Sequence, residues 1–371
     1  MKTRFLEKII YQYLHRQASR SPLQSFDPSA ISGLKRILLL TTTAIGDTLF
    51  STPAIRAVKE TYPDKEVHVL AHVRNRLLLQ ENPFIDRLLL YHGKRKKILS
   101  LFRQLKAPHY DLVIILHSND PEALPLARAT GAPFIIGRGT SRFAEFLTNR
   151  VYCLEETRHA IEQRLDFVRV IGADTANTKM DLFLPANWEE RADQILKEKW
   201  SGEFQPLIGI HPTGSGSYKW WPSQYFKSLL RELHIRYRAR FILFSSGPET
   251  EAAESIAENL GDIVLLTKGK YNLLETAVLM KKCRLFIAND SGPLHMALAL
   301  GLPTLALIGA DSPLRIGPYH VPESAFLYRK EEVCSEHHCL NQKCPDNLCM
   351  QAISPDDVLA AIKSRFEHNL L

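Results

Sequence analysis

The sequence has no long apolar run that is free of helix-breaking residues. Its longest nearly uncharged stretch, Pro293 to Ala310, is interrupted by Gly301 and Pro303. That pattern favours a buried helix, a turn and a buried strand over a membrane span. The first twenty residues carry charges every few positions, so they lack the apolar centre of a secretory signal. We therefore expect a protein of the cytoplasm.

Several motifs of nucleotide and nucleic-acid chemistry are also missing. No G-x-G-x-x-G and no G-K-[ST] is present, which disfavours nicotinamide chemistry and ATP hydrolysis. No lysine- and arginine-rich stripe with interleaved aromatics occurs, so nucleic acid is not an expected partner. The formal net charge is nevertheless +7. Such a surplus suits solubility, or an anionic partner such as a nucleotide, a phosphorylated glycolipid or an acidic membrane face.

The sequence has six cysteines, and none of them lies in a C-x2-C pair. Cys153 and Cys283 are isolated and are expected to be buried free thiols. The other four recur at every fifth position near the end of the chain: Cys334, Cys339, Cys344 and Cys349. Their spacing is a weak signal for zinc, and a cytoplasmic setting disfavours disulfides. We predict neither a metal nor a cofactor, and the role of these four cysteines stays open.

What the chain does have is length and a repeated alternation of strand-like and helix-like segments. Its 371 residues, 45% of them apolar, suit two domains of moderate size. Short apolar runs separated by helical patterns favour parallel sheets covered by helices, an α/β fold with two Rossmann-like domains. We expect domains at 31–190 and 191–353, followed by a last helix at 354–371. The predicted strands lie in 36–43, 66–72, 86–92, 111–117, 134–138, 207–212, 240–246, 263–268, 285–290 and 304–309.

The first thirty residues look like an extension that precedes this alternation. Apolar residues recur there at helical spacing, with basic residues nearby. A basic amphipathic helix can lie on an anionic membrane surface. It can equally pack on the flank of its own protein. Both interpretations of residues 1–30 remain open, and the first predicts peripheral membrane contact through residues 1–25.

The segment from Thr41 to Glu60 offers the first chemical candidate. A buried strand ends, Gly46 permits a tight loop, and Asp47 follows at once. In open α/β sheets ligands bind beyond the carboxyl ends of the strands, and in a two-sheet protein the cleft between the domains is the natural site. A carboxylate placed there can act as a general base. The alternative is that Asp47 caps the next helix.

Two segments of the second half could bind phosphate. Thr213 and Gly214 begin a loop rich in small residues, and Lys219 adds a cation. Farther on, a strand ends at Asp290, and a Ser-Gly turn leads into a helix that has a proline in its first turn. A helix start of this kind binds anions through its free N–H groups and its dipole. This second segment contains Asp290, Ser291, Gly292 and His295.

A third segment could bind sugar hydroxyls. Glu249 and Glu251 follow a strand and a Gly-Pro turn. An acidic residue in this position accepts hydrogen bonds from ribose in other nucleotide folds. Their charge at a helix start accounts for them equally well.

Taken together, these segments resemble glycosyltransferase family 9, the lipopolysaccharide heptosyltransferases. The most specific pieces are ILLLTTTAIGDTLFSTPAIRAVKETYP, with its Gly-Asp pair, and NDSGPLHMALALGLPTLALIG, with its D-[ST]-G-x-x-H helix start. The resemblance implies the GT-B fold, in which two Rossmann-like domains face each other across a cleft. It also implies that 31–190 binds the acceptor, that 191–353 binds the nucleotide sugar, and that the last helix crosses back to the first domain.

The resemblance also implies an activity. Family members transfer a heptose from ADP-heptose to the inner core of lipopolysaccharide, with inversion and without a catalytic metal. By position, Asp47 resembles the general base and Lys219 the lysine that neutralises the pyrophosphate. The other residues that resemble donor-binding positions are Thr213, Gly214, Glu249 or Glu251, Asp290, Ser291, Gly292 and His295. The implied partners are an ADP-sugar and a phosphorylated glycolipid at the cytoplasmic face of the inner membrane. The alternatives are a GT-B enzyme that uses another nucleotide sugar and a non-catalytic nucleotide- or glycan-binding protein.

Overall fold

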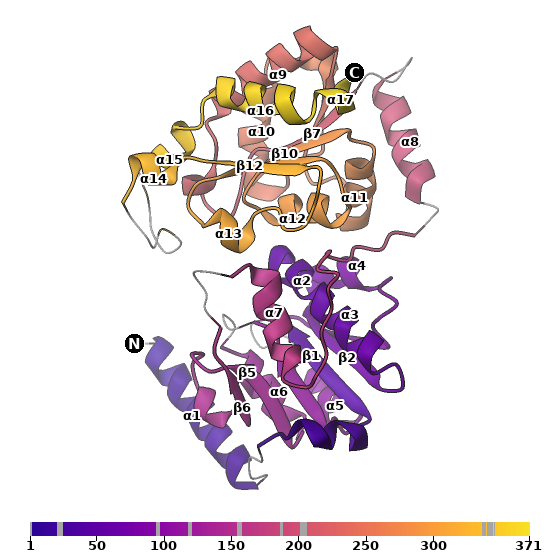
Figure 1. The fold of residues 1–371 in the computed structure, drawn as a ribbon, viewed down its shortest axis with the longest axis vertical. Helices are drawn as coiled ribbons and strands as arrows, with labels where there is room; N and C mark the ends of the chain where they lie inside the picture. Colours follow the sequence, from indigo (N-terminus) through magenta and orange to yellow (C-terminus); the bar gives the residue numbers. More distant parts are fainter. Residues whose placement is uncertain are drawn as a thin grey trace. The chain divides into compact units, whose positions relative to one another are not determined.

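The computed structural model divides the chain into two compact units, Met1–Asp181 and Leu182–Leu371 (Figure 1). Each unit is built on a six-stranded sheet in which all the pairings are parallel. The residues that the structure describes are 2–20, 25–93, 97–117, 121–153, 158–185, 188–200, 206–335, 339, 344 and 346–371.

The sheet of the first unit has the strand order β3-β2-β1-β4-β5-β6. Its central strand β1 is buried from its second residue onward, as expected for a strand covered by helices on both faces. The strands are β1 (Arg36–Thr41), β2 (Glu66–His72), β3 (Arg87–Tyr91), β4 (Leu112–Ile115), β5 (Phe134–Arg138) and β6 (Asn149–Val151). The helices are α1 (Lys2–Arg20), α2 (Ile45–Phe50), α3 (Thr52–Thr61), α4 (Arg76–Leu79), α5 (Ile98–Lys106), α6 (Ala123–Ala129) and α7 (Ala160–Arg169).

The sheet of the second unit has the corresponding order, β12-β11-β10-β7-β8-β9. Its strands are β7 (Leu207–His211), β8 (Arg240–Leu243), β9 (Val264–Leu266), β10 (Leu285–Asn289), β11 (Thr304–Ile308) and β12 (Ser324–Tyr328). Its helices are α8 (Trp188–Lys199), α9 (Ser223–Tyr237), α10 (Thr250–Ala257), α11 (Leu273–Lys281), α12 (Gly292–Ala299), α13 (Pro313–Ile316), α14 (Lys330–Val333), α15 (Leu348–Gln351), α16 (Pro355–Arg365) and α17 (Glu367–Leu370).

Both sheets therefore follow the Rossmann order, and the predicted α/β class is confirmed. All ten predicted strands are present. The two strands that the sequence did not reveal, β6 and β12, occupy the same edge position in their sheets. Neither has a fully buried residue, so neither produces the continuous apolar run from which the other strands were predicted.

In each sheet the strand order reverses next to the first strand of the unit. The reversal falls between β1 and β4 in the first unit and between β7 and β10 in the second. At such a point the connections leave in opposite directions and open a crevice at the carboxyl ends of the strands. The fold thus marks two places for ligands, one in each unit.

The N-terminal helix α1 is part of the first unit and not a separate extension. Leu14 is wholly buried in the same core as Leu101 of α5 and Leu124 of α6. The Tyr11 and Phe146 rings also meet edge to face, with centroids 5.5 Å apart. Residues 1–30 were expected either to lie on a membrane surface or to pack on the flank of the protein. One face of α1 packs on the protein. Among the described helices, none combines the length and apolar character that crossing a membrane requires.

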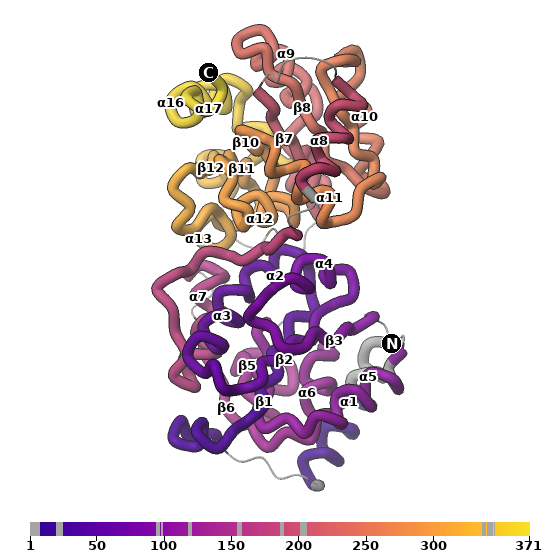
Figure 2. The backbone as a smooth tube through the Cα atoms, turned by 90° about the vertical axis from the view of Figure 1, so that its right-hand side faces the viewer, coloured from indigo at the N-terminus to yellow at the C-terminus, as the bar shows by residue number. Residues whose placement is uncertain are grey.

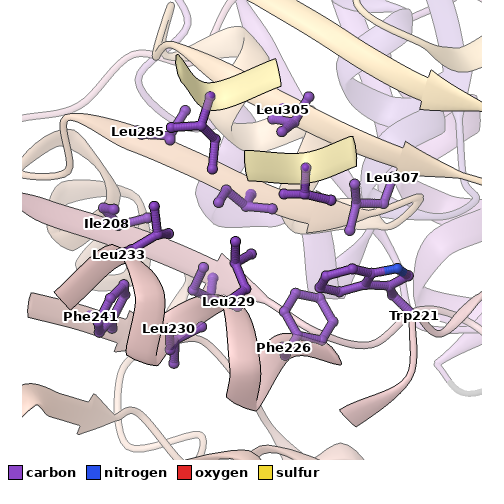
Figure 3. Packing of buried hydrophobic residues seen from close by; sticks show 14 of the residues in the cluster. Ile208, Trp221, Phe226, Leu229, Leu230, Leu233, Phe241, Leu285, Leu305 and Leu307 are labelled. Carbon is purple, nitrogen blue, oxygen red and sulfur yellow. The ribbon is translucent and has the colours of Figure 1, made fainter. Parts of the chain in front are cut away.

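A buried core cluster of the second unit packs its sheet against α9, and Figure 3 shows Trp221 and Phe226 side by side in it. Trp221 Nε1 donates to the carbonyl oxygen of Ile353, 2.7 Å away, just before α16 begins. The Ser354 hydroxyl caps α16. The last helix was expected to cross back to the first domain. Instead, its buried residues belong to the core of the second unit: Val358, Leu359, Ile362 and Phe366.

The division between the units lies at Asp181, some residues before the expected boundary at 190. Arg56 of α3 forms an ion pair with Asp181 and also donates to the carbonyl oxygens of Asn177 and Lys179. The backbone N–H of Asp181 donates to Thr52 Oγ1 at 2.8 Å. These bonds attach the segment up to Asp181 to α3, which explains why it belongs to the first unit.

Candidate active site

The reversal point of the second sheet brings together two of the segments singled out in the sequence. β7 ends at His211 and β10 at Asn289, and the two strands pair directly. Asn289 Nδ2 donates to the carbonyl oxygen of Pro212 at 2.6 Å, so the loops that follow the two strands are hydrogen-bonded to each other. The loop from Thr213 and the loop from Asp290 therefore lie side by side.

Gly214 allows these loops to approach closely. A Cβ atom at this position would lie 2.9 Å from the backbone oxygen of Asp290, closer than a carbon atom can approach without displacing it. Only glycine fits without such a shift. Trp220 Nε1 donates to the Gly214 oxygen at 3.0 Å and holds the loop in place.

The loops place a buried cation, a buried carboxylate and an imidazole in one cluster. Lys219 Nζ forms an ion pair with Asp290 Oδ2, and His295 Nε2 lies 3.8 Å from Asp290 Oδ1. Lys219 is 9% exposed, Asp290 8% and His295 4%. Burial alone would raise the pKa of Asp290, but His295 and Lys219 together lower it to about 2. Asp290 is therefore a carboxylate that holds both neighbours.

Helix α12 begins at this cluster. Its cap is Ser291, whose hydroxyl accepts from the Leu294 N–H at 3.4 Å and contacts His211 Nδ1 at 3.1 Å. Gly292 is the first residue of the helix. The first-turn N–H groups of a helix carry partial positive charge and favour an anion. Ser291, Gly292 and His295 thus lie together at this helix start, and an anion site there stays a prediction.

Glu249 lies beside the same loops, whereas Glu251 does not. Glu249 Oε2 accepts from Thr213 Oγ1 at 3.0 Å and lies 3.7 Å from His211 Nε2. Interaction with His211, and then with Thr213, lowers the pKa of Glu249 although burial opposes it. Glu251 is exposed in the first turn of α10 and makes no polar contact in the described part of the chain. This geometry favours Glu249 over Glu251 as the hydroxyl-binding glutamate.

Asp47 belongs to the first unit, at the reversal point of the other sheet. It lies in the first turn of α2, whose cap is Ala44, so it is not the capping residue. Asp47 Oδ1 accepts from Arg164 Nη2 at 3.0 Å. The Asp47 side chain is 30% exposed and that of Arg164 only 8%. Burial lowers the pKa of Arg164, and the charge of Asp47 opposes that change.

The motifs of the sequence did not point to Arg164, which lies 117 positions from Asp47 on α7. His117 was missed as well. It follows β4, and its Nε2 accepts from the Thr42 N–H at 3.1 Å, directly across the reversal point. Nε2 is therefore the unprotonated nitrogen of that ring. Nothing in the local sequence around Arg164 or His117 distinguishes them from structural residues.

None of the four C-terminal cysteines forms a disulfide bond. In the part of the chain that the structure describes, no group of three His, Cys, Asp or Glu side chains is arranged to hold a metal ion. His337 and His338, which lie between these cysteines in the sequence, are outside the described residues.

Comparison with known proteins decides the family. The sequence pattern of glycosyltransferase family 9 (heptosyltransferase) matches residues 98–345, more than half of the chain. The chain belongs to glycosyltransferase family 9. It is therefore an enzyme that transfers a sugar, and the expected enzyme class is confirmed.

Relatives of this family 9 glycosyltransferase are similar over almost their whole length. Lipopolysaccharide heptosyltransferase 3 of Escherichia coli is 26% identical over 337 residues, which cover 85% of this chain and 95% of the relative. Among solved structures, a family 9 glycosyltransferase of Veillonella parvula gives a TM-score of 0.77 at 22% identity, covering 90% of this chain and 97% of that one. The E. coli ADP-heptose lipopolysaccharide heptosyltransferase II gives 0.72 at 21% identity, covering 90% and 99%. These structures support the fold.

Proposed function

We propose that this enzyme transfers a heptose from ADP-heptose to a hydroxyl of the lipopolysaccharide inner core, with inversion at the anomeric carbon. The family and the names of its relatives support the sugar and the acceptor class. The observation that carries the proposal is the cluster at the β7/β10 reversal point. There a lysine, a helix start and a glutamate lie around one pair of loops.

In the proposed complex the diphosphate of the donor lies over the start of α12. The N–H groups of the first turn and the ammonium of Lys219 face the negative charge that grows as the diphosphate leaves. Asp290 is buried and already paired, so its role is to position Lys219 and His295. Glu249 accepts from ribose hydroxyls, exchanging its bond with Thr213 for one to the ligand. No step of this proposal needs a metal.

Asp47 is the proposed general base. The acceptor oxygen forms a bond to the anomeric carbon from the face opposite the diphosphate, the carbon–oxygen bond to the diphosphate breaks, and the hydroxyl proton passes to Asp47. Arg164 occupies Oδ1 of Asp47 and keeps the carboxylate in a fixed orientation, so that Oδ2 is the oxygen that accepts the proton. A buried arginine is suited to this task because it remains charged.

The acceptor in this proposal is a phosphorylated glycolipid at the cytoplasmic face of the inner membrane. The net charge of +7 suits such an anionic substrate. The assignment of the acceptor to the first unit rests on the position of Asp47 at the β1/β4 reversal point.

The first test is the thermal stability of the protein with ADP, UDP, GDP or CMP, each with and without EDTA. A ligand at about 100 times its dissociation constant stabilises the folded state by about 2.7 kcal/mol. We expect selective stabilisation by ADP that EDTA does not change, followed by transfer from ADP-heptose. Preference for another nucleotide would reassign the donor and keep the site. Stabilisation by none of them would contradict the donor site itself and favour a protein without this activity.

A further inference from the structure

The exposed face of α1 carries cations and apolar side chains together. The helix buries Leu14 against the first unit, and its opposite side exposes Lys8, Gln12 and Arg16, which recur at intervals of four residues. Ile9 and Tyr11, each 45% exposed, flank this row. From Lys8 to Ser19 the helix has no acidic residue.

Helix α5 repeats this arrangement. Leu101 and Leu105 are buried in the core, while Leu99, Arg103 and Lys106 are exposed at positions that share one face of a helix. Leu99 is 72% exposed, a high value for a leucine on a helix that has a buried side available. Helix α5 has no acidic residue, whereas α1 has one, Glu7, directly before Lys8.

The two helices belong to the same layer of the first unit. Both contact α6, and Leu14, Leu101 and Leu105 share one core cluster with residues of that helix. Figure 1 shows α6 between α1 and α5, and in Figure 2 the three helices lie close together. The two helices thus flank α6 in one layer of the unit. Among the described residues, Lys8, Arg16, Arg103 and Lys106 have no side-chain ion pair that would neutralise them. The nearest acidic groups along the neighbouring elements are Glu122, which is half-buried, and Glu145.

We propose that this α1–α5 face, formed by Lys8, Ile9, Tyr11, Arg16, Leu99, Arg103 and Lys106, docks on an anionic lipid bilayer. The four cations attract the phosphate headgroups, and the three apolar side chains enter the boundary between headgroups and acyl chains. Nucleic acid would match the cations but would leave exposed leucine and isoleucine side chains without a partner, so the lipid surface is the better match. The inference does not depend on which sugar the enzyme transfers.

The test uses full-length protein and sedimentation with vesicles of phosphatidylcholine alone, or with about a third phosphatidylglycerol. The first variant combines Lys8→Glu, Arg16→Glu, Arg103→Glu and Lys106→Glu. Its matched control makes the same change at four exposed basic residues of the second unit, Lys197→Glu, Arg231→Glu, Lys281→Glu and Lys363→Glu, so that both variants have the same net charge. A second pair compares Leu99→Ser with Ile235→Ser, since Ile235 is 69% exposed on α9.

We expect the wild type to bind only the anionic vesicles. The α1–α5 charge variant should lose at least about a hundredfold in partitioning, since each basic residue near an anionic surface contributes severalfold. Leu99→Ser should lose several-fold, and both controls should bind as the wild type does. Equal losses in variant and control would show a general charge effect and overturn the proposal, as would binding to duplex DNA in preference to vesicles.

Substitution is a better test than deletion of residues 1–25. Deletion would remove Leu14 from the core and could unfold the first unit, whereas the substituted side chains are exposed. Turnover on a soluble acceptor separates the two proposals. It should be unchanged in the α1–α5 variants if docking is their only defect. Unchanged vesicle binding in a protein with no transferase activity would instead contradict the proposed function alone.

Discussion

The two sheets of this glycosyltransferase share one strand order and differ in what stands at the point of reversal. In the first unit, a partly exposed carboxylate, Asp47, is held at one oxygen by the buried Arg164. In the second, the carboxylate of Asp290 is itself buried, and it holds Lys219 and His295 at the start of a helix.

We propose that this difference lets one architecture support two kinds of chemistry. The strand order fixes the place where a ligand can enter, because the crevice opens where the connections diverge. Burial then decides which charged group can react with a ligand. A partly exposed carboxylate that pairs with a buried cation, as Asp47 does with Arg164, can accept a proton. A buried carboxylate that pairs with a cation, as Asp290 does with Lys219, can only position that cation.

The largest expected effect concerns the carboxylate of the first unit. Asp47→Asn keeps the shape of the side chain but removes the base, so turnover should fall by about 10²–10⁴-fold. Stabilisation by ADP should remain, because the proposed donor-binding groups lie in the second unit. Steady-state kinetics and a thermal shift titration measure the two quantities. Glu66→Gln is the control, since Glu66 is also paired with an arginine but lies at the amino end of β2. Near-normal turnover of Asp47→Asn would remove the base from the mechanism.

The next effect concerns the cation of the second unit. Lys219→Ala should lower kcat/KM by about 10²–10³-fold, the cost of losing one preorganised group that faces developing charge. It should also weaken ADP binding, unlike Asp47→Asn, because in the proposed complex both the bound and the leaving diphosphate face this lysine. Lys227→Ala is the control, since Lys227 pairs with Glu258 on the surface of the same unit. A loss in turnover with unchanged ADP affinity would place Lys219 away from the diphosphate.

A smaller effect distinguishes the two glutamates. Glu249→Gln should weaken ADP binding by about tenfold to a hundredfold, the range for one hydrogen bond to a charged group. Glu251→Gln, two residues away and exposed, should bind ADP as the wild type does. Calorimetric titration of both variants compares them directly. The reverse result would mean that the loop changes register when the nucleotide binds.

How far the sequence could predict this arrangement differs between the sheets and the sites. The central strands were predictable because burial on both faces demands a continuous apolar run, as in β1 and β10. The helix start at Ser291 and Gly292, where we propose the phosphate site, was predictable too, since its residues are contiguous in the chain. The partner of Asp47 was not, because Arg164 reaches it from a helix that only the folded chain brings near. The helical spacing of apolar residues in α1 likewise revealed an apolar side. It did not reveal that the first unit would cover Leu14.

The smallest effect is on stability and is confined to the second unit. The pKa of Asp290 in the folded protein is about 2, below the ordinary value of 3.8, so the folded state binds this proton less readily than the unfolded state. The resulting stabilisation is complete above about pH 5 and is lost as the pH falls toward 2. A difference of that size corresponds to about 2 kcal/mol.

All four tryptophans of the chain, at positions 188, 200, 220 and 221, lie in the second unit, so their fluorescence reports its unfolding in urea. We expect the difference in unfolding free energy between wild type and Asp290→Asn to be constant from pH 7 to 5 and to shrink below pH 4, because protonation makes the native carboxyl resemble the amide. Asp47→Asn should not change the pH dependence of this signal. If the difference in unfolding free energy between wild type and Asp290→Asn stayed constant down to pH 3, Lys219 and His295 would not hold Asp290 in its charged form. The contrast between the two reversal points would then rest on burial alone.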